Sequence, residues 1–200
     1  MIKWLRIMLV MLVFLPSGAQ AAPLVGDLSN YRINIDSGFN GTRIFLFGTR
    51  NETGDIVVVV RGPLQDYIVR KKEQIAGIWV NNDRMKFFNV PDFYAVASSR
   101  PLSEIEQTNI FRQLGIGIDN LLTPPLDPKW QEKFTTFSSA FLDYQKERRR
   151  YKAEPTNMQF MAETLFKTTI EFPDNIPPGN YTAEIYLING GDVMGMQSIP

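Results

Sequence analysis

The chain of 200 residues contains no cysteine and no histidine. Without cysteine it can form no disulfide, thiol nucleophile or thiolate metal site. Without histidine it can form no Ser-His-Asp triad and no His-ligated zinc site, and it lacks the usual general base near neutral pH. Any catalysis would rest on Asp, Glu, Lys, Tyr or Ser side chains, or on hard cations bound through oxygen. We therefore predict a protein that is not an enzyme, with no catalytic residue, metal site or cofactor.

An excess of charge is also missing, because 21 Lys and Arg residues balance 21 Asp and Glu residues. A nucleic-acid-binding protein usually carries a basic surplus, so this class is set aside. Hydrophobic residues make up 44% of the chain and include 14 Phe, which is enough for a packed core and argues against general disorder. The length suits one domain after a targeting segment is removed.

The N-terminal segment 1–21 has the features of a secretory signal. Lys3 and Arg6 precede an apolar run from Ile7 to Leu15, and Ala19 and Ala21 form a small-x-small cleavage site. The apolar run is shorter than the roughly 20 residues of a bilayer span, and an uncleaved N-terminal anchor is the alternative. We expect residues 22–200 to form a single exported domain on the periplasmic side of the inner membrane.

Four consecutive valines, Val57 to Val60, lie between Gly54 and Pro63. A β-branched run without a polar face predicts a central strand that is covered on both sides. Further strands are predicted on either side of it, separated by glycine-rich and charged turns about every ten residues, including a charged turn at 70–74. They are 31–36, 43–48 (apolar on both faces), 66–70, 77–81, 84–88, 93–97, 165–172 and 180–188.

The C-terminal part predicts a hairpin. Asn189 to Asp192 is a strong hairpin turn, and a return strand begins at Val193. This strand stops at Pro200, so we expect either a further C-terminal portion or a short edge strand. The predicted fold class is mainly β, an immunoglobulin-like β-sandwich with a helical insertion at about 103–151, α+β overall.

The helical insertion begins at a capping box, Ser103 to Glu106, with a short helix to Leu114 that Gly115 ends. A longer helix is predicted over 129–151. Its aromatic residues form one stripe, which predicts either contact with a membrane surface or a partner, or packing on the domain's own sheet. The possible partner-binding residues are Trp130, Phe134, Phe137, Phe141 and Tyr144.

Two basic groups are candidates for binding anions. Arg148 to Arg150 sit at the end of the long helix, where positive charge complements the helix dipole or meets anionic headgroups or an acidic partner. A second group flanks the central strands and would bind a small oxyanion if its members converged; ordinary solvated strand ends are the alternative. Its members are Arg61, Arg70, Lys71, Lys72 and Arg100.

Several ordered tracts of the chain resemble the uncharacterised alphaproteobacterial "putative transmembrane protein" family. The resemblance implies a signal peptide, a periplasmic β-rich domain and a C-terminal membrane helix, in proteins associated with sulfite or taurine-type exporters. No apolar segment of that kind precedes Pro200, and the family implies no activity or site residues. The tracts are 41–48, 54–63, 77–81, 93–101 and 178–181.

We therefore expect a membrane-associated interaction domain that binds an envelope or inner-membrane protein, such as a transporter, through the helical insertion or an open sheet edge. Two alternatives stay open. One is a small-oxyanion-binding module that uses the second basic group. The other is a hydrolase built on two carboxylates roughly 5–10 Å apart in a cleft.

Overall fold

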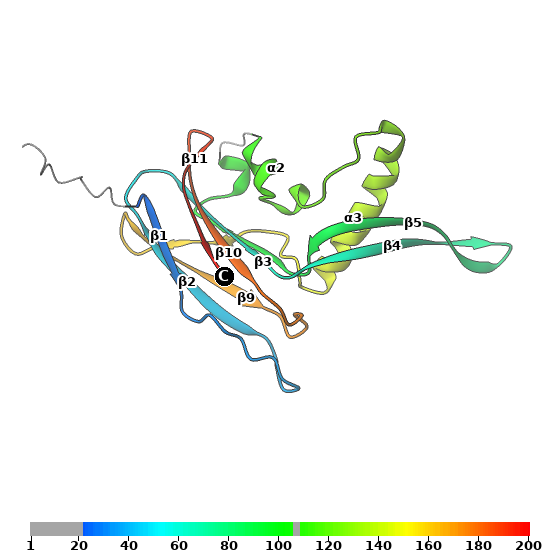
Figure 1. The fold of residues 1–200 in the computed structure, drawn as a ribbon, viewed down its shortest axis with the longest axis horizontal. Coiled ribbons are helices and arrows are strands. Elements are labelled where there is room, and N and C mark those ends of the chain that lie inside the picture. Colours follow the sequence, from blue (N-terminus) through cyan, green and yellow to red (C-terminus); the bar gives the residue numbers. More distant parts are fainter. Residues whose placement is uncertain (1–21, 106–108) are drawn as a thin grey trace, which may run out of the picture.

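The computed structural model describes residues 22–105 and 109–200, apart from the side chains of residues 75, 79, 80 and 82. The predicted signal segment 1–21 and Glu106 of the predicted capping box lie outside the described residues. The chain forms two packed sheets, a projecting two-stranded ribbon and a helical segment that lies beside the ribbon (Figure 1).

The valine run forms β3 (Asp55–Arg61), the middle strand of a five-stranded sheet with the order β11-β10-β3-β6-β7. All residues from Ile56 to Val60 are buried, with exposed fractions of 3% or less. Val58 and Val60 face the second sheet, whereas Val57 and Val59 face the helical segment. The prediction of a central strand covered on both sides is confirmed. The other strands are β6 (Tyr94–Ser98), β7 (Thr156–Asn157), β10 (Thr182–Asn189) and β11 (Asp192–Ile199).

The second sheet has the order β1-β2-β9-β8 and packs against the even-numbered face of β3. Ile44 and Leu46 point into this core, whereas Phe45 and Phe47 are each 41% exposed on the outer face. The strand predicted to be apolar on both faces therefore has only one face in the core. The mostly β fold with a helical insertion is confirmed, and the immunoglobulin-like topology stays a prediction. The strands are β1 (Leu24–Leu28), β2 (Thr42–Arg50), β8 (Gln159–Phe160) and β9 (Leu165–Phe172).

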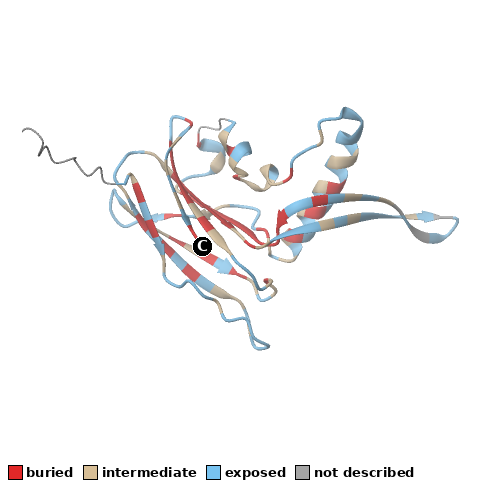
Figure 2. Ribbon diagram, in the orientation of Figure 1, coloured by how far each residue is buried: buried red, intermediate tan, exposed pale blue. Residues whose placement is uncertain are grey.

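The ribbon consists of β4 (Leu64–Ile75) and β5 (Ile78–Pro91), joined at Ala76 and Gly77. Both turn residues have positive φ, 51° and 83°, as a tight two-residue hairpin turn requires. The prediction of three shorter strands with a charged turn at 70–74 was wrong. Charged residues continue along the strand at 70–74, where the side chains are exposed or half-buried, so no hydrophobic pattern marks this part of the ribbon (Figure 2).

The helical segment lies between β6 and β7 and covers the odd-numbered face of β3 with Phe111, Ile116 and Leu122. The predicted long helix is confirmed as α3. The predicted cap at Ser103 is instead part of a single 3-10 turn, preceded by Pro101 without a side-chain cap. Gly115 ends the short helix in the left-handed conformation, as predicted. The elements are η1 (Leu102–Glu104), α2 (Ile110–Leu114), η2 (Ile118–Asn120), η3 (Pro128–Trp130) and α3 (Gln131–Glu147).

Two predictions for the ends of the chain had different outcomes. The strand predicted over 31–36 is absent: this alternating segment pairs with no described strand, and Ile33 is its one residue that packs against the core. The C-terminal hairpin is confirmed: Gly190 and Gly191 have φ of 58° and 83°, and β11 pairs with β10 from Asp192 to Ile199.

Candidate functional site

The aromatic stripe of α3 packs mainly against the ribbon. Phe141 is 2% exposed, and its ring centre lies 4.9 Å from that of Tyr67 and 5.5 Å from that of Phe87. Phe137 is 4% exposed, and Phe134 contacts Phe87 at 5.9 Å. The prediction that Phe137 and Phe141 contact a partner is therefore corrected, because both rings are covered by the protein's own core.

The two ends of the stripe remain accessible. Trp130 is 45% exposed and Tyr144 is 48% exposed. The ammonium group of Lys133 lies 5.3 Å from the Trp130 ring, and the Tyr144 hydroxyl accepts a hydrogen bond from Arg148 at 2.5 Å. Only these two aromatic residues of the predicted stripe have about half of their surface available to another molecule.

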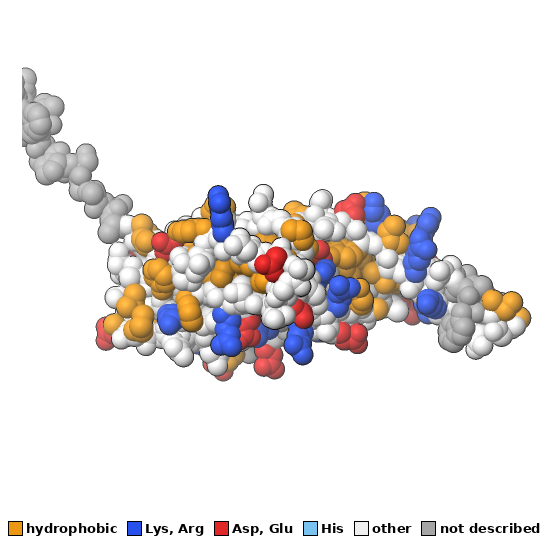
Figure 3. All heavy atoms as spheres, turned by 90° about the horizontal axis from the view of Figure 1, so that it is seen from below, with side chains coloured by type: hydrophobic (Ala, Val, Ile, Leu, Met, Phe, Trp, Pro, Cys, Tyr) orange, Lys and Arg blue, Asp and Glu red, His pale blue; other side chains and the backbone are white. Residues whose placement is uncertain are grey.

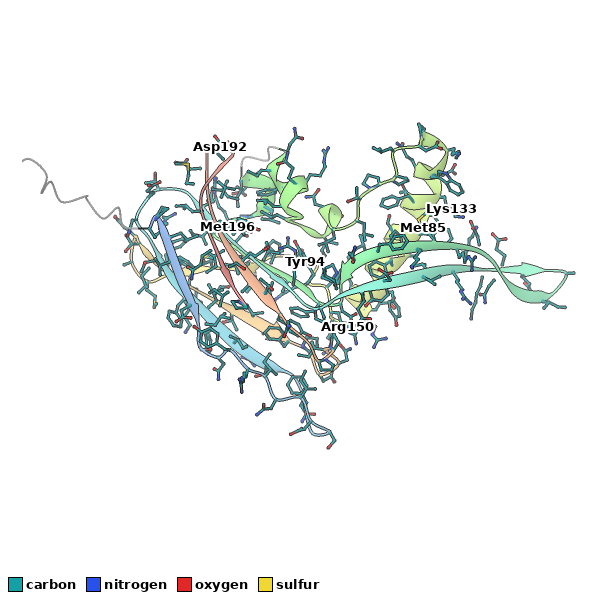
Figure 4. The ribbon with its side chains drawn as sticks, viewed as in Figure 1. Met85, Tyr94, Lys133, Arg150, Asp192 and Met196 are labelled. Carbon is teal, nitrogen blue, oxygen red and sulfur yellow. The ribbon has the colours of Figure 1, made fainter. Side chains whose placement is uncertain are left out.

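The inner half of the ribbon is braced by α3. Lys133 of α3 forms an ion pair with Asp83 of β5. The nearby Met85 packs against the hydrophobic core beneath the helical segment (Figure 4). The strand pairing shifts between Lys71 and Lys72, opposite this contact. Beyond this shift the ribbon continues past the helix to the turn at Ala76 (Figure 1).

The exposed surface of the whole ribbon combines apolar and basic residues. Ile78, next to the turn, is 67% exposed, and Ile68 is 52% exposed. Hydrophobic side chains form the far end of the molecule, and basic side chains lie behind it (Figure 3). Among the described residues, each ribbon strand pairs only with the other, so both outer edges carry unpaired backbone groups. The two ribbon strands together carry three acidic residues and five basic ones, which are Arg70, Lys71, Lys72, Arg84 and Lys86.

A buried polar network fixes the base of the ribbon. Asp92 is 4% exposed and accepts hydrogen bonds from the Tyr67 hydroxyl and, at 2.8 Å, from Arg150. Arg150 also donates to the backbone carbonyl of Asn175 at 2.6 Å. Burial, together with the hydrogen bond to Asp92, raises the pKa of Tyr67 to about 12. The network joins the ribbon, the end of α3 and the loop between β9 and β10 (Figure 4).

The basic residues predicted to form an oxyanion site do not converge. Arg61 forms an ion pair with Glu184 and donates to the carbonyl of Leu114, whereas Arg100 binds Asp55 at 2.5 Å. Asp55 and Arg61 occupy opposite ends of β3, about 20 Å apart at roughly 3.3 Å per residue. The remaining members, Arg70, Lys71 and Lys72, lie on the ribbon, where Lys71 pairs with Glu73.

The hydrogen bond from Arg100 holds the pKa of Asp55 below its usual range. This pair and the Arg61–Glu184 pair connect neighbouring strands and segments of the sandwich. Arg61 and Arg100 are therefore structural ion-pair residues in this conformation: the Arg61 side chain is mostly buried, at 20% exposed, whereas the Arg100 side chain is about half exposed, at 49%.

A different basic site lies between the end of α3 and the adjoining ends of β2 and β9. It is a cleft of about 740 Å³. Phe93 and Phe172 lie beneath it, where their rings stack at 4.9 Å in the core of the sandwich. The sequence signal that could have found it is the run of arginines after α3, but the other contributors come from distant segments. The basic side chains that line it are Arg43, Lys146, Arg149 and Lys152.

The three consecutive arginines have three different roles. Arg148 contacts Tyr144, Arg150 enters the buried network, and Arg149 lines the cleft. Arg149 has φ of 57°, in the left-handed region that glycine usually occupies after a helix. This conformation is unfavourable by roughly 1 kcal/mol for a residue with a Cβ.

Acidic residues are also present at the cleft, in Glu171 and Asp174. Glu171 lies 3.8 Å from Lys152 and 4.0 Å from Arg43. An exposed carboxylate between two cationic side chains holds them near each other by electrostatic attraction. In the ranges 22–105 and 109–200, no group of three or more acidic residues is placed to hold a metal ion.

The comparisons with known proteins identify one family. Residues 23–200 match the family model described as "Putative transmembrane protein (Alph_Pro_TM)". No curated protein and no solved structure matches the chain. Within the described part of the chain, none of the helices has the length and apolar character needed to cross a bilayer.

Proposed function

The chain belongs to this "Putative transmembrane protein" family. From this membership we propose that it is an exported, non-enzymatic domain of the bacterial envelope. In this proposal it docks onto an integral membrane protein through the β4–β5 ribbon. The proposal places the domain on the periplasmic side of the inner membrane, where the predicted signal segment would deliver it. An accessory role beside a transporter follows from the same placement.

One observation carries this proposal: the ribbon reaches beyond the body of the molecule (Figure 1), and hydrophobic side chains form its far end (Figure 3). A large apolar side chain on an exposed projection marks a candidate interaction site, because its hydration is unfavourable until another surface covers it. Ile78 is 67% exposed at this end. Neither hydrophobic core contains Ile78, so the fold does not need this side chain for its packing.

The ribbon offers two kinds of contact. Its open edges can pair with a strand of the partner through backbone hydrogen bonds, and its apolar end can enter a hydrophobic groove. The basic residues along its sides favour a partner whose groove has an acidic rim, since complementary charges orient the two proteins during association. The bracing by α3 keeps the ribbon extended before binding, which lowers the entropy lost when the complex forms.

Photo-crosslinking in the native host tests the proposal. A photoreactive amino acid at Ile78 should give an adduct with one integral membrane protein, identified by mass spectrometry of the membrane fraction. The matched control is the same substitution at Phe45, which is 41% exposed on the outer face of β2. No membrane-protein adduct from Ile78, or the same adduct from both positions, would refute docking through the ribbon. Capture of a transporter would support the accessory role.

A further inference from the structure

The cleft beside the end of α3 has the size and the lining of a small-molecule site. Its volume of about 740 Å³ lies in the range of roughly 300–1,000 Å³ that is typical of ligand pockets. Phe93, Tyr151 and Phe172 lie along its floor, but they are only 2%, 2% and 6% exposed, so most of the surface that faces the cleft comes from other residues. The few polar groups at its rim would fix the orientation of a bound molecule.

The charges at the cleft favour an anion. Four basic side chains line it, against the two carboxylates Glu171 and Asp174. Lys152 and Arg43 share Glu171 at 3.8 Å and 4.0 Å, with all three side chains well exposed. Exposed ion pairs of this kind are weak and exchange readily, so both cations are available to an arriving anion.

Arg149 has an unfavourable backbone conformation for a residue with a side chain. Its amide donates to the carbonyl of Lys146 at 2.8 Å, and the next two amides bond to the carbonyl of Gln145, so it ends α3 where glycine is usual. Its φ is 57°. Among the described residues, no carboxylate lies within ion-pair distance of Arg149. A strained backbone position that holds an unpaired guanidinium at a cleft is typical of a functional site.

From this geometry we propose that the cleft binds a small organic anion, with its oxyanion group on Arg149 and the rest of the molecule inside the cleft. Arginine suits this role because its guanidinium donates two parallel hydrogen bonds to a phosphate or carboxylate. Two kinds of molecule carry such a group: a soluble organic phosphate and the headgroup of an anionic phospholipid. The inference does not rest on docking through the ribbon, because the cleft and the ribbon end are formed by different residues.

The test compares the exported protein, purified from its host's envelope, with the variant Arg149→Gly. Glycine is the residue that the left-handed position prefers, so the variant should melt at a temperature at least as high as the parent. If Arg149 binds the anion, the variant should still bind phenyl phosphate about tenfold more weakly or worse, because a charge-assisted hydrogen bond is lost. Calorimetric titration measures both dissociation constants, and Arg112→Gln on exposed α2 is the control, expected to bind like the parent.

Vesicles distinguish the two sources of the ligand. If the ligand is a lipid headgroup, the parent should bind phosphatidylglycerol vesicles more tightly than phosphatidylcholine vesicles, and Arg149→Gly should lose this preference. If the ligand is a soluble anion, the parent should bind phenyl phosphate but not the vesicles, and Arg149→Gly should bind phenyl phosphate more weakly. Lys152→Gln provides a second variant at the same cleft and should also weaken binding. The proposal is refuted if the parent binds neither probe, or if Arg149→Gly binds both probes as the parent does.

Discussion

At the scale of single residues, burial separates two ion pairs of similar chemistry. The side chains of Asp92 and Arg150 are 5% and 15% exposed, whereas those of Asp55 and Arg100 are 17% and 49% exposed. A buried charge that loses its partner cannot be solvated, so removing one member of the inner pair leaves an uncompensated charge. Water and salt screen the outer pair, which contributes less to stability.

We expect Asp92→Ala to lower the free energy of unfolding by roughly 3–5 kcal/mol, because Arg150 and the Tyr67 hydroxyl lose their buried acceptor. Urea denaturation monitored by circular dichroism measures the change. Adding Arg150→Met should restore part of the loss, since the orphaned charge is removed as well. A change below about 1 kcal/mol for the single variant would show that the network is not needed for stability.

Asp55→Asn should cost about 0.5–1 kcal/mol at neutral pH, since Arg100 is half exposed and the pair is screened. The pKa of Asp55 is lower in the folded protein than its ordinary value of 3.8, so the pair's stabilisation is fully present above that value. It is lost as the pH falls through the folded pKa. Urea denaturation at neutral and at acidic pH should therefore show the difference between parent and variant shrinking in acid. If the difference in unfolding free energy between parent and variant is the same at both pH values, the Asp55–Arg100 pair is not its cause.

At the scale of elements, α3 serves as the support of the ribbon. An isolated two-stranded ribbon is marginally stable in water. Here the rings of Tyr67 and Phe87 pack on Phe141, and the Lys133–Asp83 ion pair adds a second attachment. The outer ribbon beyond Lys72 has no such support in the described part of the structure. The same helix that covers the core thus determines how far the proposed docking element projects.

We expect Phe141→Ala to lower the free energy of unfolding by roughly 3–5 kcal/mol and to weaken the attachment of the ribbon. Hydrogen exchange should become faster in β4 and β5 than in β3, whose ladder is held from both sides. The control is Phe45→Ala on the outer face, which should cost much less because Phe45 is 41% exposed. Equal acceleration in all three strands would indicate global unfolding instead of loosened support.

At the scale of the whole molecule, one sheet separates two hydrophobic cores. The even-numbered residues of β3 form the core of the sandwich, and the odd-numbered residues form the core beneath the helical segment. The ribbon leaves the sheet after Gly62 and ends far from β1, at the opposite end of the molecule (Figure 1). This arrangement leaves the ribbon end accessible while the sandwich remains intact, so the proposed docking element and the fold can be altered separately.

The sequence alone was sufficient for the central strand, the C-terminal hairpin and α3, because each has a local pattern: a β-branched run, a glycine turn or an amphipathic period. Local pattern could not show that 31–36 lacks a strand partner, or that charged residues 70–74 continue the ribbon, because strand pairing depends on distant segments. The aromatic stripe was visible in the sequence, but only tertiary packing determined that Phe137 and Phe141 face the protein's own core. The same holds for the basic residues, because nothing in the local sequence distinguishes Arg61 and Arg100 from Arg149. Only the tertiary structure places a carboxylate beside Arg61 and Arg100, and a cleft beside Arg149.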